Sequence, residues 1–249
     1  MKIFAALLIL SVVFTFVFAN CATAPQYFDA EYDFSYVYTE EPELPEPEHE
    51  YERIAYLTFD DGPTAALTPQ VLDILLEHNI RATFFVLPNS GVDHLFERII
   101  AEGHALGNHS YTHDFSRLYA NDGGVFFRND TIRMHEFLYN NFGYETNLYR
   151  FPGGSMSWSR TAVDLRRSIL EELGYVYFDW HVSSADTDTS PAGRDPNVLA
   201  GNILNNTGGR EQLVVLMHDT WNQAVVEALP MIINGLREQG YGFDTLRNF

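Results

Sequence analysis

Two adjacent aspartates and a spaced pair of histidines are the residues whose types and spacing point to chemistry. Asp60 and Asp61 lie in LTFDDGPT, between an apolar run and a Gly-Pro turn. His109 and His113 lie in HSYTH, and on one helical turn their imidazoles would share a face and could hold one metal ion. Taken alone, this spacing also fits two surface histidines of a helix. The zinc-protease pattern HExxH is absent because position 110 is a serine, so a base and a third ligand must come from elsewhere.

The paired aspartates can supply both missing groups. One carboxylate can complete a His-His-Asp ligand set, while the other takes a proton from a water molecule whose pKa the metal lowers to about 7. A calcium loop is excluded because its spaced acidic ligands are missing from this segment. The residues alone do not decide which aspartate has which role.

The elements that must position these residues alternate between strands and helices. Short apolar strands are expected at residues 54–59, 81–87, 104–107, 148–151, 175–179 and 213–217. Helices are expected from Thr68-Pro69 onward and at residues 92–102, 125–141, 160–173 and 223–239. This alternation predicts one parallel α/β domain over residues 51–249. Because such folds bind ligands beyond the carboxyl ends of their strands, polar residues that follow five of the strands are expected to converge on one cleft.

The N-terminal segment predicts export. Residues 1–24 combine a positive start, an apolar run from Ile3 to Ala19 and a small-residue cleavage site, which together are typical of a secretory signal peptide. The run is shorter than the ~20 residues of a membrane-spanning helix. Cys21, the single cysteine, could carry a lipid anchor, although Asn20 before it departs from the usual lipidation pattern. We therefore expect an extracellular or cell-envelope protein.

Charge argues against a nucleic-acid partner. Residues 25–50 hold nine acidic residues, four prolines and no Lys or Arg, and are expected to form an acidic, proline-rich linker. The whole chain has a net charge of −19, and without Lys2 and the nine linker acids residues 51–249 retain 14 basic and 25 acidic residues, a net −11. An acidic body suits neutral or amine-bearing ligands better than phosphate polymers. No specific protein partner is indicated.

Five segments resemble, in order, the motifs of the polysaccharide deacetylases, the NodB-type carbohydrate esterase family 4. They are TFDDGP (58–63), HSYTH (109–113), RFPGG (150–154), DWHVSSAD (179–186) and LMH (216–218). The resemblance covers residues 54–246 and implies a distorted (β/α) barrel, for which we expect seven parallel strands. It also implies metal-dependent removal of N- or O-acetyl groups from sugars, with Zn²⁺ expected first and Co²⁺, Ni²⁺ or Mn²⁺ as alternatives.

The resemblance further implies roles for the residues around the paired carboxylates. Asp60 is implied to be the general base, and Asp61 a metal ligand together with His109 and His113. Arg150 resembles the arginine that pairs with the base and orients it. In this interpretation the two neighbouring aspartates have different partners.

A second group of implied residues handles the leaving group. His218 resembles the general acid that protonates the departing amine, and Asp186 the carboxylate that tunes it, with Asp179 as the alternative. Asp219 is expected to be a turn residue or helix N-cap. His104 is expected to be a buried, hydrogen-bonded strand residue and not a ligand.

The third motif and its neighbours are implied to bind substrate. The backbone N–H near Gly153 resembles an oxyanion donor, Pro152 belongs to the same substrate-binding loop, and Leu216 is implied to wall the pocket for the acetyl methyl group. Many relatives have an aromatic residue where this chain has Gly153, so the groove is expected to be more open here. The fourth motif of many relatives ends in Asp-Trp, whereas this chain has Asp186-Thr187, and Trp158 or Trp180 could supply the missing aromatic surface.

The sequence therefore predicts an exported, metal-dependent deacetylase of an acetylated sugar polymer, with N-acetylglucosamine in peptidoglycan as the first choice. Chitin oligosaccharides and O-acetylated xylan are alternative substrates. A catalytically silent carbohydrate-binding protein of the same fold, or a different amide hydrolysis such as lactam or cyclic-imide opening, are alternative functions. The presence of both Asp60 and His218 favours the enzyme.

Overall fold

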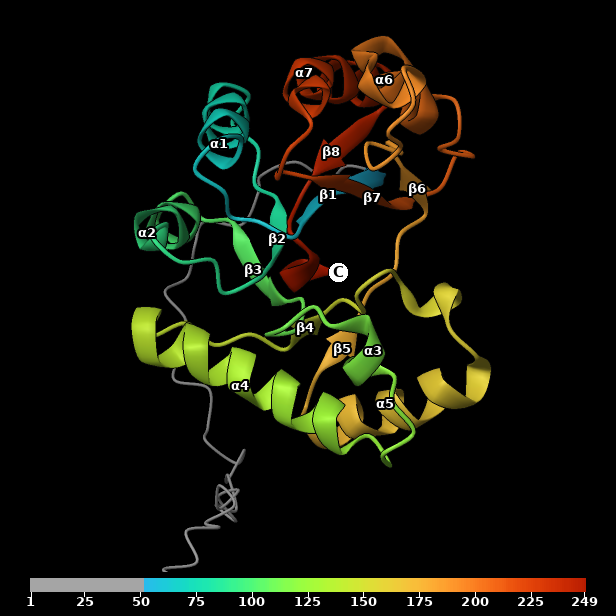
Figure 1. Ribbon diagram of the computed structural model, residues 1–249. Coiled ribbons are helices and arrows are strands. Elements are labelled where there is room, and N and C mark those ends of the chain that lie inside the picture. Colours follow the sequence, from blue (N-terminus) through green and yellow to red (C-terminus); the bar gives the residue numbers. More distant parts are fainter. Residues whose placement is uncertain (1–51) are drawn as a thin grey trace, which may run out of the picture. The chain divides into compact units, whose positions relative to one another are not determined.

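The computed structural model describes residues 52–249 (Figure 1). The predicted signal peptide (1–24), the predicted linker (25–50) and Cys21 lie outside the described residues. Within residues 52–249, no helix is long and apolar enough to cross a membrane.

The centre of the fold is a sheet in which every pair of neighbouring strands is parallel. Its strands are β1 (Arg53–Asp60), β2 (Thr83–Val86), β3 (Ala105–Asn108), β4 (Leu148–Tyr149), β5 (Val176–Tyr177), β6 (Val182–Ser183), β7 (Gln212–His218) and β8 (Tyr241–Phe243). Seven of them follow the order β5-β4-β3-β2-β1-β7-β6, and β8 adds a short pairing to β1. The predicted α/β fold with seven parallel strands is confirmed, with β8 as an addition.

The sheet curls into a half-barrel and is not closed by hydrogen bonds in the described part of the chain. The two ends of its strand order, β5 and β6, are separated by only four residues in sequence, 178–181. Parallel neighbours need a crossover of a dozen or more residues, so these two strands cannot pair directly. This gap is the distortion of the barrel that the resemblance to the polysaccharide deacetylases implied.

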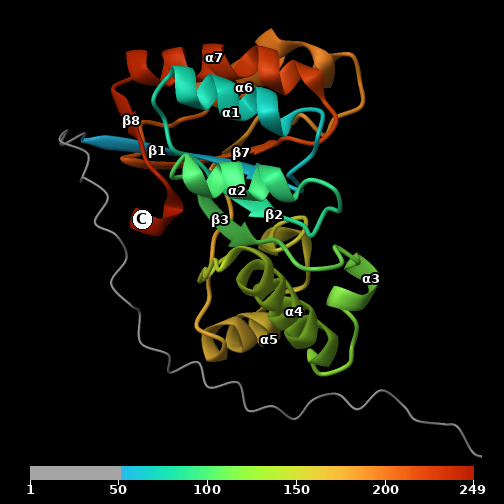
Figure 2. The same ribbon diagram turned by 90° about the vertical axis from the view of Figure 1, so that its left-hand side faces the viewer.

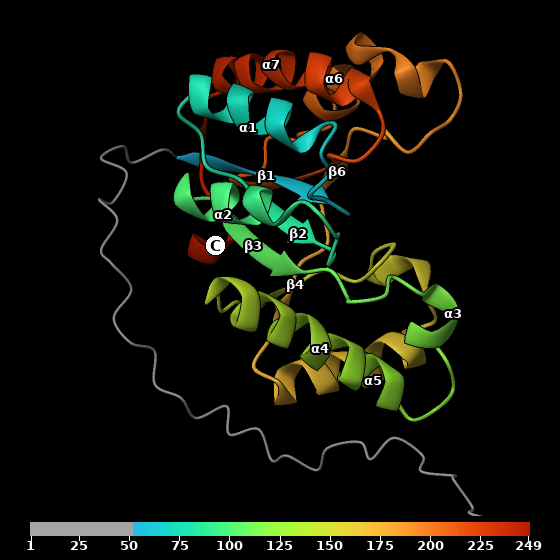
Figure 3. The ribbon, with the colours of Figure 1, turned by 60° about the vertical axis from the view of Figure 1, so that its left-hand side comes forward.

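Helices cover the outside of the curled sheet (Figures 2 and 3). They are α1 (Thr68–Glu77), α2 (Asp93–Ala101), α3 (Phe115–Leu118), α4 (Val125–Phe142), α5 (Arg160–Glu172), α6 (Pro196–Leu204) and α7 (Gln223–Glu238). Helix α7 packs against α1, α6 and β8, whereas α4 and α5 pack against each other and against β3 and β5. Figure 3 shows the arrowheads of β1, β2 and β3 pointing toward one end, where α3 also lies.

Strand β1 brings its final aspartate to the inner face of the sheet. Side chains alternate between faces along a strand. The main hydrophobic core beneath the helices includes, from this strand, Ala55, Leu57 and Phe59. Thr58 and Asp60 occupy the other face, where both contact Arg150. Asp60 therefore ends the strand inside the half-barrel, and Asp61 begins the turn beyond it.

Several predicted boundaries differ from the structure. The helix expected from Thr68-Pro69, α1, does begin at Thr68, but Thr68 is its first residue and not the N-cap that a threonine before proline suggests, because Leu67 occupies that position. The hydroxyl of Thr68 instead donates to Asp219. Helix α6 was not predicted, although Asp195 caps it and Pro196 opens it, which is a typical start signal. Strands β6 and β8 were not predicted because two or three residues give no periodic pattern.

Candidate active site

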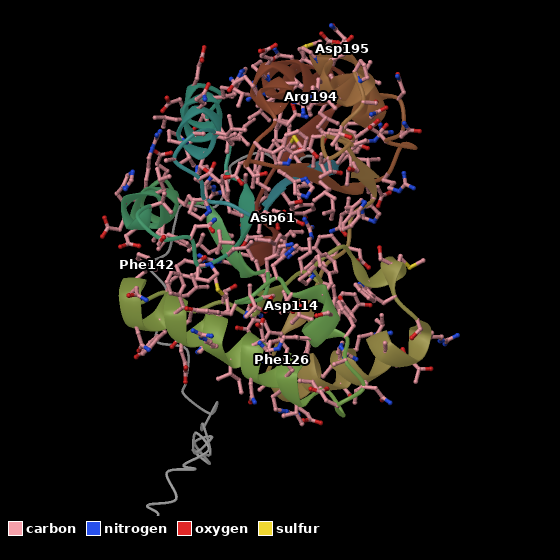
Figure 4. All side chains as sticks on the ribbon, in the orientation of Figure 1. Asp61, Asp114, Phe126, Phe142, Arg194 and Asp195 are labelled. Carbon is pink, nitrogen blue, oxygen red and sulfur yellow. The ribbon has the colours of Figure 1, made fainter. Side chains whose placement is uncertain are left out.

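Residues from five strand ends meet at one mouth of the half-barrel. Asp60 ends β1, His109 follows β3, Arg150 follows β4, Asp186 lies beyond β6, and His218 ends β7. In the register of the sheet, Asp60 lies directly beside His218. Figure 4 shows Asp61 between Asp114 on one side and Arg194 on the other. The parallel sheet thus places the candidate catalytic and metal-binding residues predicted from the sequence at the same end of its strands.

The turn after β1 holds Asp61 in a backbone conformation that few residues adopt. Asp61 has a φ of +72°, in the left-handed region that Asp and Asn tolerate better than most residues. Asn89 donates to the backbone carbonyls of Asp61 and Pro63 at 3.2 and 3.0 Å. A Cβ atom at Gly62 would lie 2.2 Å from the carboxylate of Asp219, so only glycine fits there. These contacts fix the backbone of the turn that carries Asp61.

Asp61, His109 and His113 form a group that could hold a metal ion. Their nearest ligand atoms all lie within 4.8 Å of one another. Asp61 Oδ1 lies 3.4 Å from His109 Nε2 and 3.2 Å from His113 Nε2. This oxygen is buried and receives no hydrogen bond. An orphaned carboxylate oxygen facing two imidazole nitrogens fits a divalent cation with nitrogen and oxygen ligands.

The histidine ring nearest the core is already oriented for such a cation. His109 Nδ1 lies 2.9 Å from the backbone carbonyl of Arg150 and donates a hydrogen bond to it, so Nε2 is the ring nitrogen that faces Asp61. Burial alone would raise the pKa of Asp61, but its contacts with His109 and the charges of the other histidines lower it to about 2. The carboxylate is therefore ionised and ready to bind a cation at neutral pH.

The HSYTH segment is a loop and not a helical turn, so the predicted local structure was wrong. Ser110 and His113 have φ values of +77° and +51°. Asp130 of α4 is buried and accepts hydrogen bonds from the N–H groups of Tyr111 and Thr112, at 2.7 and 3.1 Å. The role of Asp130 could not be predicted from the sequence, because a polar residue in a helix gives no sign that it braces a loop 18 residues earlier.

Asp60 and Arg150 form a buried ion pair at the inner face of the sheet. Arg150 is fully buried, and its Nη1 donates to Asp60 Oδ1 at 2.9 Å and to Thr58 Oγ1 at 2.6 Å. Its Nε donates to the carbonyl of Phe178 at 2.9 Å, and the guanidinium lies over the ring of Phe85. The other oxygen of Asp60, Oδ2, lies 3.7 Å from His109 Nε2. One carboxylate oxygen is thus held by arginine while the other faces the metal-ligand group.

His218 is held by Asp186 through two hydrogen bonds. Its Nδ1 lies 2.9 Å from Asp186 Oδ1, and its backbone N–H donates to Asp186 Oδ2 at 2.7 Å. Burial alone would lower the pKa of His218, but Asp186, with smaller contributions from Asp60 and Asp61, raises it to about 9. Asp179, the alternative partner, instead accepts hydrogen bonds from the backbone N–H and the hydroxyl of Ser155. Asp179 therefore braces the loop that follows Arg150.

Replacing Asp186 with Asn should lower the pKa of His218 from about 9, because the two largest contributions that raise it, the hydrogen bond to Asp186 and the charge of Asp186, are lost or weakened. NMR titration of the metal-free protein measures this shift. In the wild type, the His218–Asp186 pair stabilises the fold fully below pH 6.5, and this stabilisation is lost as the pH rises through 9. Asp186→Asn should therefore be less stable than the wild type mainly below pH 9. The exposed Asp188→Asn is the matched control. An unchanged His218 titration would contradict the assignment.

The predicted substrate-binding loop has a crowded side that the sequence did not indicate. Gly153 is exposed with a φ of +73°, whereas Pro152 and Leu216 are buried. A Cβ atom at Gly153 would lie 2.9 Å from the ring of Phe115. The groove beside Gly153 was predicted to be more open, but the ring of Phe115 lies there. Of the two tryptophans considered, Trp158 stacks on Phe115 at a centroid distance of 5.6 Å.

Two other polar residues, His104 and Asp219, are buried outside the metal-ligand group. His104 is buried and accepts a hydrogen bond from the N–H of Ala82 at 3.1 Å, and burial lowers its pKa to about 4. It is a neutral, hydrogen-bonded residue beside β3, as expected. Asp219 is not a helix N-cap, because Asn222 caps α7. It is fully buried behind Gly62, and burial raises its pKa to about 7.

Comparisons with known proteins agree with this architecture. Residues 48–178 match the family model described as polysaccharide deacetylase. A peptidoglycan-N-acetylglucosamine deacetylase of Bacillus cereus is 37% identical over 196 residues, which are 77% of this chain and 68% of the relative. The chain belongs to the polysaccharide deacetylase family.

Solved structures give the same result. A Streptococcus mutans CE4 esterase has a TM-score of 0.71 and 29% identity, with 78% of this chain and 86% of that chain covered. A Bacillus cereus polysaccharide deacetylase has a TM-score of 0.68 and 35% identity, with 78% and 91% covered. The half-barrel is therefore the fold of this family.

Proposed function

We propose that this protein is a metal-dependent deacetylase that hydrolyses N-acetyl groups of a sugar polymer, with N-acetylglucosamine in peptidoglycan as its substrate. One observation carries the proposal: a buried arginine-bound carboxylate, Asp60, lies against a separate group of three potential metal ligands and, in the sheet register, beside a histidine held by a carboxylate. Binding alone would not require this combination. The similarity to the Bacillus cereus peptidoglycan deacetylase supports the choice of sugar.

Asp60 is suited to act as the general base. Arg150 holds its Oδ1, so Oδ2 is the oxygen that can accept a proton from water at the ligand group. A divalent cation held by Asp61, His109 and His113 would act as a Lewis acid and promote ionisation of that water. Because Asp60 is positioned by arginine and not by the ligand group, it remains available for proton transfer.

His218 is suited to act as the general acid. With a pKa of about 9 it carries a proton at neutral pH and can donate it to the nitrogen of the departing amine. Asp186 occupies Nδ1, so Nε2 is the nitrogen that can donate to the substrate. The exposed Gly153 is suited to offer its backbone N–H to the oxyanion that forms from the acetyl carbonyl. Buried Leu216, in β7 two residues before His218, is suited to contact the acetyl methyl group.

We propose Zn²⁺ as the cation, since one carboxylate and two imidazoles with an open position are typical of catalytic zinc sites. Co²⁺, Ni²⁺ and Mn²⁺ accept similar ligands and are the alternatives.

Replacing His113 with Ala should lower zinc affinity by at least about tenfold, because one of three protein ligands is lost. The metal content of purified protein after dialysis against a zinc buffer measures this effect. His94→Ala, at an exposed position of α2, is the matched control and should retain zinc. Equal zinc content in both variants would argue against this ligand set.

A panel of acetylated glycans tests the function itself. Peptidoglycan, chitin oligosaccharides and acetylated xylan are incubated with zinc-loaded protein, and released acetate and product masses are measured. Acetate release from N-acetylated glycans, lost with a chelator and restored by zinc, is the expected result. Release from xylan alone would indicate an O-acetyl esterase, and no release from any glycan would refute the enzyme.

We also propose that the protein acts outside the cytoplasm, on the basis of the predicted signal peptide (1–24). Cell fractionation, with Cys21→Ala compared with the unchanged chain, tests both export and a lipid anchor. Retention of the uncleaved chain in the cytoplasm would contradict the proposal.

A further inference from the structure

Three aromatic rings stack beside the candidate active site; we name Phe115, Tyr119 and Trp158 the aromatic shelf. Trp158 is the middle ring, with centroid distances of 5.6 Å to Phe115 and 3.5 Å to Tyr119. The planes of each pair lie within 28° and 10° of parallel. Phe115 remains 38% exposed at the outer end of the stack, so one ring of the shelf is accessible to a ligand.

The shelf is anchored to the predicted oxyanion loop. Tyr119 Oη and Trp158 Nε1 both donate to the carbonyl of Pro152, each at 3.4 Å. The ring of Phe115 lies over Gly153, where a Cβ atom would approach it to 2.9 Å. The shelf therefore occupies the space that a side chain at position 153 would have filled.

The shelf is also continuous with the metal-ligand group. Phe115 meets the ring of His113 edge to face, at a centroid distance of 4.9 Å. His113 in turn lies 3.2 Å from Asp61 Oδ1. A single imidazole ring, that of His113, thus lies between Phe115 and Asp61. In the view of Figure 4, Asp114, the residue before Phe115, lies below Asp61.

We propose that Phe115 binds the sugar ring next to the sugar whose acetyl group is removed, and so makes the enzyme prefer chains over single sugars. This inference rests on the proposed deacetylase function. A pyranose has an apolar face of C–H groups that packs on a flat aromatic ring, and hydroxyls around its edge that need polar partners. Asp114 and the exposed Ser116 flank Phe115 and are suited to such hydroxyls. The neutral or amine-bearing sugar also suits a body of net negative charge.

Kinetics on substrates of two sizes test the proposal. Phe115→Ala should raise KM for N-acetylglucosamine oligosaccharides roughly tenfold, in the range of aromatic stacking, with little change in kcat. KM and kcat for the single sugar N-acetylglucosamine, which cannot reach both positions, should remain within about twofold. An equal loss on both substrates, or unchanged kinetics on both, would overturn the proposal.

Two further variants separate stacking from packing. Phe115→Leu keeps apolar contact over Gly153 without a flat ring and should behave like the alanine variant, whereas Phe115→Trp should restore oligosaccharide binding. Tyr139→Ala, which removes an exposed ring of α4, is the control and should leave both substrates unaffected. Full activity of Phe115→Leu on oligosaccharides would mean that the ring only packs.

Binding measured without turnover distinguishes failure of this inference from failure of the proposed function. In Asp60→Asn protein, N-acetylglucosamine oligosaccharides should change the fluorescence of Trp158, the ring stacked on Phe115, and Trp158→Phe should remove that change. Acetate release by the wild type with identical oligosaccharide affinity in wild type and Phe115→Ala would refute the inference alone. Absence of acetate release by the wild type would refute the proposed function instead.

Discussion

Asp60→Asn is expected to slow acetate release by about 10²- to 10⁴-fold, the usual contribution of a general base, while the protein keeps its fold and its metal affinity. Asparagine has nearly the same shape as aspartate and can still accept a hydrogen bond from Arg150 through its side-chain oxygen. It cannot take a proton from water. The measurement is kcat on an N-acetylglucosamine oligosaccharide, together with the zinc content of the purified variant.

The neighbouring Asp61→Asn is the matched comparison. The same substitution one residue later should lower zinc affinity, because Asp61 Oδ1 is the orphaned oxygen that faces His109 and His113. Added zinc at high concentration should recover part of the activity of Asp61→Asn and none of that of Asp60→Asn. If Asp60→Asn alone lost zinc, Asp60 would be the metal ligand and Asp61 the general base, which would contradict the proposed roles.

Arg150→Met is expected to destabilise the fold by about 3–5 kcal/mol, because the carboxylate of Asp60 is then buried without its cationic partner. Methionine fills much of the volume of the arginine stem but leaves the hydroxyl of Thr58 and the carbonyl of Phe178 without their donors. Urea unfolding of the wild type and the variant at pH 7 measures the difference in the free energy of unfolding.

A double variant separates the charge from the packing. Adding Asp60→Asn to Arg150→Met removes the buried charge, so the double variant should be more stable than Arg150→Met alone. A loss below about 1 kcal/mol in Arg150→Met would mean that Asp60 is solvated or otherwise compensated. An equally unstable double variant would assign the loss to packing and hydrogen bonds.

The order of the elements could be predicted because it depends on local patterns. Strands with unbroken apolar runs, such as β1 and β7, and helices with caps and apolar periodicity appear directly in the sequence. A parallel α/β fold then places the polar residues after each strand at one end of the sheet. The approach of Asp60, Arg150 and His218 follows from that rule and needs no knowledge of individual contacts.

Contacts between distant segments could not be predicted in this way. The loop of HSYTH is shaped by positive φ values and by Asp130 of a later helix, whereas the i, i+4 spacing alone favours a helical turn. Gly153 suggested an open groove because nothing in the sequence indicates that Phe115 lies over it. The choice between Asp186 and Asp179 likewise required the hydrogen bonds of His218 and Ser155.

The most direct test of the account is acetate release from an N-acetylglucosamine oligosaccharide by metal-stripped protein titrated with zinc. Mass spectrometry should detect no loss of acetyl groups before zinc is added, and activity that saturates at about one zinc ion per chain, as expected for a single ligand group. Zinc-loaded Asp60→Asn should keep a rate about 10²- to 10⁴-fold below that of the wild type at every zinc concentration. Acetate release by the metal-free protein, or full activity of zinc-loaded Asp60→Asn, would contradict the account.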